Sequence, residues 1–190
     1  MKRIAAKICG LAALSLFTFG FTQAQMKSGK TKMVGGAVMY PSKNIVQNAM
    51  NSKDHTTLVA AVKAAGLVKT LEGKGPFTVF APTNEAFDAL PAGTVDNLLK
   101  PANKGKLTAI LTYHVVPGKL DSKRLMKMIK KGHGKAALKT VNGGMLTVMM
   151  KDNHLWIVDR KGNKAMVTIA DVYQSNGIIQ VINKVLLPSS

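Results

Sequence analysis

Residues 75–91 read Gly-Pro-Phe-Thr-Val-Phe-Ala-Pro-Thr-Asn-Glu-Ala-Phe-Asp-Ala-Leu-Pro and are the most informative segment of the chain. Phe77 to Ala81 form an apolar strand that ends at Pro82, because proline has no N–H to donate to a sheet. Thr83 then suits the N-cap of a helix, and Glu85 suits the positive end of the helix dipole. The segment therefore predicts a strand that turns directly into a helix. It is an architectural corner that contains no nucleophile, metal ligand or phosphate-binding loop.

The first 24 residues have the pattern of a secretory signal peptide. A basic start is followed by an apolar stretch, Ile8 to Phe21, and by small residues before Gln25. The apolar stretch is short for a bilayer span, which needs about 20 residues; a retained N-terminal anchor is the alternative. We expect residues 1–24 to be a signal peptide, 25–38 a flexible basic leader and 39–190 one domain. The mature chain would then have no transmembrane span and would be secreted, either periplasmic or extracellular at the cell surface.

Charge and cysteine content narrow the classes of partner. Cys9 is the only cysteine and lies in the predicted signal peptide, so we expect no disulfide and no cysteine metal site in the mature chain. The formal net charge is +18, and removing Lys2, Arg3 and Lys7 lowers it to +15. A domain this basic is attracted to polyanions such as acidic polysaccharide, lipopolysaccharide, anionic lipid or nucleic acid. Simple solubility is the plainer explanation of the same charge.

The second half of the chain has the pattern of an antiparallel meander. Turn signals recur at Asn142-Gly143, Asp152-Asn153, Gly162-Asn163 and Asn176-Gly177. Between them lie five apolar segments, several with alternating polar residues: 138–141, 145–151, 155–159, 165–173 and 178–187. The first half instead carries helix signals, with predicted caps at Ser42 and Asp54, helix starts at Thr94 and Asn103, and a stop at Gly66. The fold class is therefore α+β, in a single domain without internal repeats.

Three segments together resemble the signature elements of the fasciclin (FAS1) domain family. They are Gly75–Pro91, Tyr113-His114 and Asn176–Pro188, in the family's order and at its spacing, within a similarity that covers 42–188. The resemblance implies a β-wedge or sandwich of mostly antiparallel strands flanked by helices, with the first and last motifs as neighbouring strands. It also implies a small single-domain secreted bacterial member with a role in cell adhesion or extracellular matrix contact and no enzymatic activity.

Two positions depart from the family's usual pattern. Gln180 stands where the last motif commonly has His, and Asn183 stands where it commonly has Asp. Gln keeps a hydrogen-bonding side chain without a titration near neutral pH, and Asn keeps the shape of Asp without its charge. We expect the fold to tolerate both changes, whereas an adhesion contact that needs the carboxylate is placed in doubt.

Tyr113 and His114 allow two interpretations. In the fasciclin family the pair has been linked to receptor binding, which makes both residues candidates for partner binding. Adjacent residues of an extended segment point in opposite directions, however, so one of the two is expected to be buried. A buried Tyr or His needs a polar partner, and the pair then has a structural role.

The sequence gives little support for a catalytic site or a metal site. His55, His133 and His154 are scattered without metal-ligand spacing, and no paired-carboxylate or nucleophile motif appears. We therefore expect no catalytic residues, no metal site and no cofactor. Export and a methionine-rich chain make Cu(I) binding conceivable, since thioethers and imidazole suit that ion, but methionine is also ordinary core filling. The methionines concerned are Met126, Met128, Met145, Met149 and Met150, with His154 nearby in sequence.

The segment 120–139 predicts a basic amphipathic helix, begun by Asp121 or Ser122 and ended by Gly132-His133-Gly134. One face carries Lys123, Arg124, Lys127, Lys130 and Lys131, and the other carries Leu125, Met126, Met128 and Ile129. Lys119, Lys135 and Lys139 add to the charge. Such a helix can lie on an anionic membrane surface or bind acidic polymer; otherwise its apolar face packs on the sheet and its lysines are solvated. Aromatic residues are sparse here, so we expect no specific nucleic-acid binding.

Two hypotheses of function follow. The first is an exported, non-enzymatic adhesion or surface-interaction module. Its basic face would bind an anionic polysaccharide, lipopolysaccharide or another cell-surface component. The second is a periplasmic protein that binds a small ligand or Cu(I) through Met and His residues.

Overall fold

The computed structural model describes residues 31–188. Its main sheet has seven strands in the order β4-β3-β9-β8-β7-β6-β5. The strands are Val115–Pro117 (β4), Phe77–Pro82 (β3), Gly177–Ile182 (β9), Lys164–Gln174 (β8), His154–Val158 (β7), Met145–Lys151 (β6) and Lys135–Lys139 (β5). The Val141 N–H, just after β5, donates to the Val115 carbonyl of β4 at 2.8 Å, so the sheet curls almost into a barrel.

The predicted corner lies in β3, between β4 and β9. β3 pairs in parallel with β9, with Phe77 opposite Gly177 and Pro82 opposite Ile182. The other neighbouring strands of the sheet are antiparallel. The first and last sequence motifs are therefore neighbouring strands, as the resemblance implies. The sequence predicted that the strand would end at Ala81. In the structure the strand is one residue longer, because Pro82 still pairs with Ile182 of β9.

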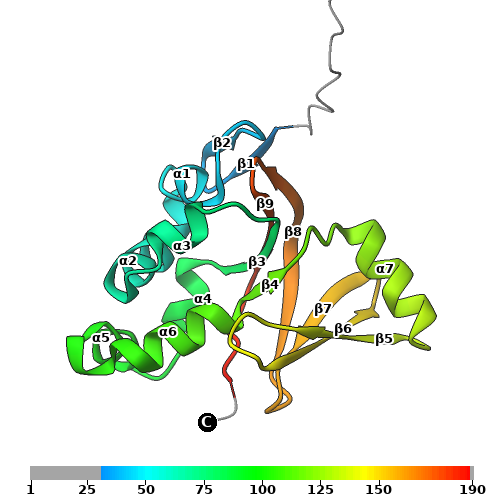
Figure 1. Ribbon diagram of the computed structural model, residues 1–190. Helices are drawn as coiled ribbons and strands as arrows, with labels where there is room; N and C mark the ends of the chain where they lie inside the picture. Colours follow the sequence, from blue (N-terminus) through cyan, green and yellow to red (C-terminus); the bar gives the residue numbers. More distant parts are fainter. Residues whose placement is uncertain (1–30, 189–190) are drawn as a thin grey trace, which may run out of the picture.

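In the part of the chain that the structure describes, seven helices and two short 3₁₀ turns accompany the sheet. They are α1 (Ile45–Ala49), α2 (Thr56–Ala65), α3 (Val68–Glu72), α4 (Asn84–Asp88), α5 (Thr94–Leu99), α6 (Lys104–Tyr113) and α7 (Ser122–Lys131), with η1 (Lys53–His55) and η2 (Pro101–Asn103). Figure 1 shows α1–α6 grouped on one side of β3 and β9, while α7 accompanies β5–β7 on the other. The α+β architecture is confirmed.

Two hydrophobic cores follow from this arrangement. Along β3, Val79 and Ala81 belong to the core under helices α1–α6, whereas Phe80 belongs to the core enclosed by α7 and β5–β8. β9 divides in the same way, with Ile179 in the first core and Ile182 in the second. Strands that are buried on both faces read as continuous apolar runs, which is why these two motifs are so apolar in sequence.

Several helix boundaries differ from the expected ones because other side chains satisfy the backbone. Asn44, not Ser42, caps α1, through a capping box with Gln47. Asp54 lies inside η1 and does not cap α2. Gly66 ends α2 as predicted, in the left-handed conformation with φ 74°. α5 begins at Thr94, and α6 begins directly after Asn103, as expected.

A β-hairpin occupies the end of the predicted flexible leader, 25–38, of which residues 25–30 lie outside the described part of the chain. Lys32–Val34 (β1) pairs with Ala37–Met39 (β2), and the side chains of Val34 and Met39 are each only 2% exposed. The Lys32 ammonium also donates to the Ala170 carbonyl of β8. This apolar packing orders a segment whose Lys- and Gly-rich composition suggested flexibility. The predicted signal peptide lies outside the described residues.

Within residues 31–188, no helix combines the length and the apolar composition that a membrane crossing requires.

Candidate functional site

The N-terminus of α7 is fixed by two carboxylates. Asp121 is the N-cap, and its side chain accepts from the Arg124 N–H at 2.8 Å. Asp171 of β8 accepts from the Ser122 N–H at 2.7 Å and also from the Ser122 hydroxyl. Negative charge is favourable at this end of a helix, where N–H groups lack intrahelical partners. The helix is thus tied to the sheet at its first residue.

The predicted division of α7 into two faces is present, with one correction. Leu125 and Ile129 are buried in the second core, and Met128 packs against it. Met126, which the sequence placed on the same apolar face, is instead 39% exposed. Its position on the helix lies next to Lys130, at the border of the basic face. The buried stripe is therefore narrower than the sequence predicted.

The basic face of α7 points to solvent. Its five members are all exposed: Lys123, Arg124, Lys127, Lys130 and Lys131. Lys119, before the helix, and Lys135 and Lys139 of β5 are exposed as well. Among residues 31–188, the single ion pair joins Lys151 and Asp152, at 3.9 Å, so none of these side chains is neutralised by a carboxylate there. The Lys119 ammonium lies 5.3 Å from the ring centre of Tyr173, a cation–π contact. The face can therefore meet an anionic partner.

Tyr113 and His114, the other candidate pair, are both buried and use their polar atoms inside the domain. The Tyr113 hydroxyl donates to the Met145 carbonyl at 2.8 Å and accepts from the Arg160 N–H at 3.3 Å. His114 Nδ1 lies 2.8 Å from the Ile110 carbonyl, and Nε2 accepts from the Leu186 N–H at 3.0 Å. A partner could touch these side chains only after the fold opens locally. Their role in binding stays a prediction.

Burial also sets the ionisation of this pair. Complete burial lowers the pKa of His114 to about 4, although its bond to the Ile110 carbonyl acts in the opposite direction. The imidazole is therefore neutral at pH 7, with Nδ1–H as donor and Nε2 as acceptor. Burial raises the pKa of the Tyr113 hydroxyl. Both groups thus stay uncharged in the folded protein near neutral pH.

The two departures from the family pattern are built into the fold. The Gln180 side chain is fully buried; its carbonyl accepts from the Asp171 N–H at 3.0 Å. Its amide donates to the Leu120 carbonyl at 3.2 Å and to Asp171 Oδ1 at 3.1 Å. Asn183 exchanges hydrogen bonds with Met166, its Oδ1 accepting from the Met166 N–H at 2.8 Å. Gln180 and Asn183 therefore organise backbone rather than offer charge at the surface.

Sequence reasoning missed Asp171. This residue has φ 56°, a left-handed conformation that is uncommon for side chains other than Asn and Asp, at an irregularity in the β8–β9 ladder. It links the start of α7 to Gln180. A single carboxylate within the apolar run 169–172 was the one available signal, and it did not indicate a partner 49 residues away.

The methionines of the Cu(I) hypothesis are divided between different surfaces. Met128 and Met150 pack against the second core, and Met126 is exposed on α7. Met145 and Met149 lie on the opposite face of β6 from the buried Leu146 and Val148. Within residues 31–188, no group of three or more His, Cys, Asp or Glu side chains has the geometry to hold a metal ion.

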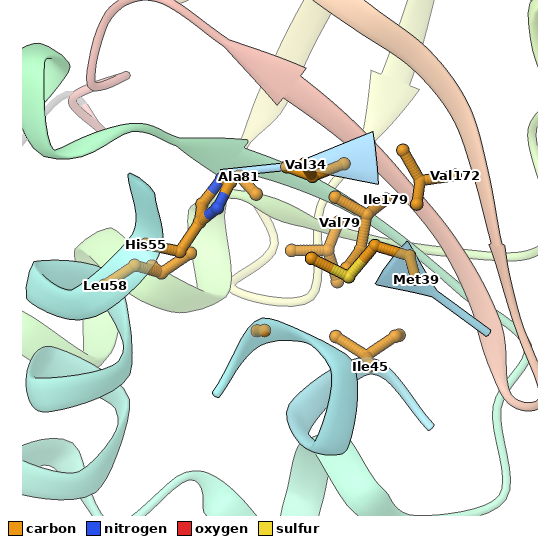
Figure 2. Close-up of a pocket in the computed structure, with 10 residues that line it drawn as sticks. Val34, Met39, Ile45, His55, Leu58, Val79, Ala81, Val172 and Ile179 are labelled. Atoms are coloured by element: carbon orange, nitrogen blue, oxygen red, sulfur yellow. The ribbon is translucent and has the colours of Figure 1, made fainter. Parts of the chain in front are cut away.

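A small cavity under the hairpin is lined by a buried histidine whose Nε2 has no hydrogen-bond partner among residues 31–188. His55 is 3% exposed, and its Nδ1 lies 2.9 Å from the Ser52 hydroxyl. Figure 2 shows its ring beside Ala81 and Val34, among apolar side chains that line about 20 Å³ of space. That volume holds about one water molecule. A second cavity in the same core measures about 40 Å³, so neither accommodates a typical small-molecule ligand.

Comparison with known proteins agrees with this geometry. The Fasciclin domain family profile matches residues 53–188. The chain is 46% identical to Protein sll1483 of Synechocystis sp. over 190 residues, covering 98% of both chains. It is 35% identical to the cell surface glycolipoprotein MPB83 of Mycobacterium bovis over 145 residues, 74% of this chain and 58% of that one. A solved FAS1 domain pair from the insect cell adhesion molecule Fasciclin I superposes with a TM-score of 0.69 at 20% identity, over 78% of this chain and 52% of the other, which shows the shared fold.

Proposed function

Because this chain belongs to the fasciclin domain family, we propose that it is an exported, non-enzymatic adhesion or surface-interaction module that binds an anionic envelope or matrix polysaccharide through the basic face of α7. One relative is named a cell surface glycolipoprotein, and the domain pair of the same fold comes from a cell adhesion molecule. These names support a role at a surface. The partner's chemistry is inferred from this chain's own residues.

The observation that carries the proposal is the exposed and unpaired charge of α7. The five basic side chains of one face project from a helix that is fixed at its start by Asp121 and Asp171. Rigid placement lowers the entropy lost when several lysines contact one polymer chain. Each exposed contact contributes modestly and is screened by salt, so the binding is expected to be weak, multivalent and salt-sensitive.

The alternative of a small-ligand or Cu(I) carrier has less support. The methionines are divided between surfaces, and the two cavities of the first core are too small for an organic ligand. The larger hollow of about 420 Å³ beside Gly75, Lys119 and Asn176 is an open surface depression rather than an enclosed pocket. Equilibrium dialysis against Cu(I) tests the metal form directly. Stoichiometric uptake would revive that alternative.

Chromatography on a heparin column tests the proposal. We expect the native protein to be retained at about 0.15 M salt. Changing Lys123, Arg124, Lys127 and Lys130 to Ser should move elution to clearly lower salt, because these side chains are exposed and their loss should leave the fold intact. A matched variant changes four exposed lysines of the helical side instead: Lys63, Lys69, Lys100 and Lys106.

The matched variant separates a specific face from general charge. Both variants lose four positive charges, so equal shifts in elution would mean that net charge, not the α7 face, causes retention. Flow-through of the native protein at that salt would overturn the proposal.

A further inference from the structure

The outer face of β5–β8 carries a row of side chains that faces away from the second core. Strand register places Lys135 opposite Met149, Met149 opposite Trp156, and Trp156 opposite Met166. Because side chains alternate along each strand, these four residues share one face of the sheet. We call this surface the outer face; it includes no residue of α7.

The centre of the outer face is apolar except for Thr147, which lies between Met145 and Met149 on β6. Met145 and Val158 extend the row of Met149, Trp156 and Met166, and all five side chains are half-buried. None of them belongs to the two core clusters of residues 31–188, whereas their strand neighbours Leu146, Val148, Leu155, Ile157 and Ala165 belong to the second. These five side chains therefore lie beside one another on this face, and no core residue among residues 31–188 covers them. Their outer surfaces form an apolar patch within the part of the chain that the structure describes.

Trp156 is held at the middle of this patch. Its indole N–H donates to the Lys151 carbonyl at 3.2 Å, which fixes the ring against β6. Trp156 is also the only tryptophan in the chain. An indole that combines an apolar body with a polar N–H is favoured at the boundary between acyl chains and headgroups.

The rim of the outer face is basic. Lys135, Lys139, Lys151 and Lys164 alternate onto this face and are all exposed. Among residues 31–188, one exposed carboxylate lies at this rim. It belongs to Asp152, which pairs with Lys151 at 3.9 Å. Asp159 nearby is buried and accepts the backbone N–H groups of Lys161 and Asn163. Four lysines thus surround an apolar centre with little opposing charge.

We propose that the outer face docks on a layer of anionic lipid. The lysines would contact the phosphate groups, while Trp156 and the methionines reach the upper acyl chains. Lysine side chains lay their methylene stems along an apolar surface and keep the ammonium in the polar layer, which suits this arrangement. A polysaccharide offers phosphate- or carboxylate-like charge but no acyl chains for the thioethers to enter. The apolar centre therefore favours lipid over the polymer proposed for α7, and this inference does not rest on that function.

Tryptophan fluorescence reports this contact at one site. The purified protein is mixed with vesicles of phosphatidylglycerol and phosphatidylcholine in equal parts, at about 0.15 M salt. We expect a blue shift of the emission and quenching when the acyl chains are brominated near the headgroup. Vesicles of phosphatidylcholine alone should give neither. The predicted signal peptide contains no tryptophan, so binding through a retained leader would not by itself move the emission.

Charge variants locate the docking surface. Changing Lys135, Lys139, Lys151 and Lys164 to Ser should weaken vesicle binding at least about tenfold, because each lysine near an anionic bilayer contributes favourably. The matched variant that changes Lys63, Lys69, Lys100 and Lys106 should bind much more tightly than this one. The variant of α7 should retain quenching at saturating lipid. Circular dichroism confirms that each variant is folded.

Three results would overturn the inference. The first is an absence of binding to the anionic vesicles. The second is sedimentation with vesicles without a blue shift or quenching, which would mean that another face docks. The third is an emission shift with heparin, dependent on the four rim lysines, without any response to vesicles; the outer face would then belong to a polymer site. Free glycerol phosphate should produce no shift, since it has no acyl chains.

Discussion

The side chain of Gln180 and the backbone and carboxylate of Asp171 hold each other in place beneath the start of α7. Gln180 Oε1 accepts from the Asp171 N–H at 3.0 Å, and Gln180 Nε2 donates to Asp171 Oδ1 at 3.1 Å. The same carboxylate accepts from the Ser122 N–H at 2.7 Å. The position of the basic helix is thus coupled to a buried amide in the last family motif, and the strands of the central sheet fix the helix that carries the proposed polymer contact.

Removal of the Asp171 carboxylate should detach the first turn of α7. We expect Asp171→Ala to cost about 2–3 kcal/mol, because Ser122 and Gln180 lose an acceptor and alanine fits a left-handed conformation poorly. Asp171→Asn should cost less, about 1 kcal/mol, since asparagine tolerates that conformation and keeps one acceptor oxygen. Urea unfolding measures both values.

Amide hydrogen exchange locates the effect of these variants. Faster exchange should appear at Ser122 and Arg124, at the start of α7, while the amides of α2 stay protected. Equal destabilisation by Asp171→Ala and Asp171→Asn would contradict the role assigned to the carboxylate.

The contact between the hairpin turn and η1 should be sensitive to a single methyl group. A Cβ at Gly35 would lie 2.3 Å from the Ser52 hydroxyl and 2.6 Å from the Asp54 nitrogen, whereas a Cβ at Gly36 would meet nothing within 4 Å. Both glycines have positive φ, 58° and 73°, so Gly→Ala adds similar backbone strain at each.

We therefore expect Gly35→Ala to be less stable than Gly36→Ala by about 1–3 kcal/mol, the usual cost of overpacking. Thermal unfolding of the two variants measures the difference. Limited proteolysis should cut Gly35→Ala faster between residues 31 and 40. Similar stabilities would mean that the hairpin adds little to the domain.

The sequence predicted the parts of the fold that depend on local pattern. The strand and turn at Phe77–Thr83, the alternation of β6 and the cap of α7 at Asp121, one of its two predicted positions, all follow from residue type and spacing. It did not predict that Val34 and Met39 would be buried, because that burial depends on distant strands.

The two candidate surfaces differ in the same way in how far the sequence predicts them. The helical spacing of the basic residues predicted the basic face of α7, because these residues are close together in the sequence. The link between Asp171 and Ser122 and the row through Trp156 depend on which segments become neighbours. Alternation shows that a strand has two faces, but only the placement of α7 decides which face stays uncovered.

The Tyr113 hydroxyl should matter for stability rather than for polymer binding. Tyr113→Phe leaves the Met145 carbonyl and the Arg160 N–H without this partner, so we expect a loss of about 1–2 kcal/mol. Tyr40→Phe is the matched control, because Tyr40 is 44% exposed and should change little. Retention of Tyr113→Phe on heparin should equal that of the native protein, and a clear loss of retention by the folded variant would support the binding role instead.

Acid should destabilise the domain through His114. The pKa of this residue falls from 6.5 to about 4 on folding because of its burial, so the folded state resists protonation. Its contribution to stability is complete above pH 6.5, declines as the pH falls toward 4, and does not decline further below that value. The loss over this window is about 3 kcal/mol. Protonation would also remove the acceptor that Nε2 offers to the Leu186 N–H.

Urea unfolding between pH 7 and pH 4 tests this, with His114→Gln as the comparison. Glutamine keeps one donor and one acceptor but does not titrate. The variant should be less stable at pH 7 and should lose less stability than the native protein on acidification. Burial also lowers the pKa of His55, so a smaller acid loss of the same sign should remain in the variant. If the two proteins lose the same free energy between pH 7 and pH 4, His114 is not the group that acid titrates, and His55 together with the carboxylates must account for the effect.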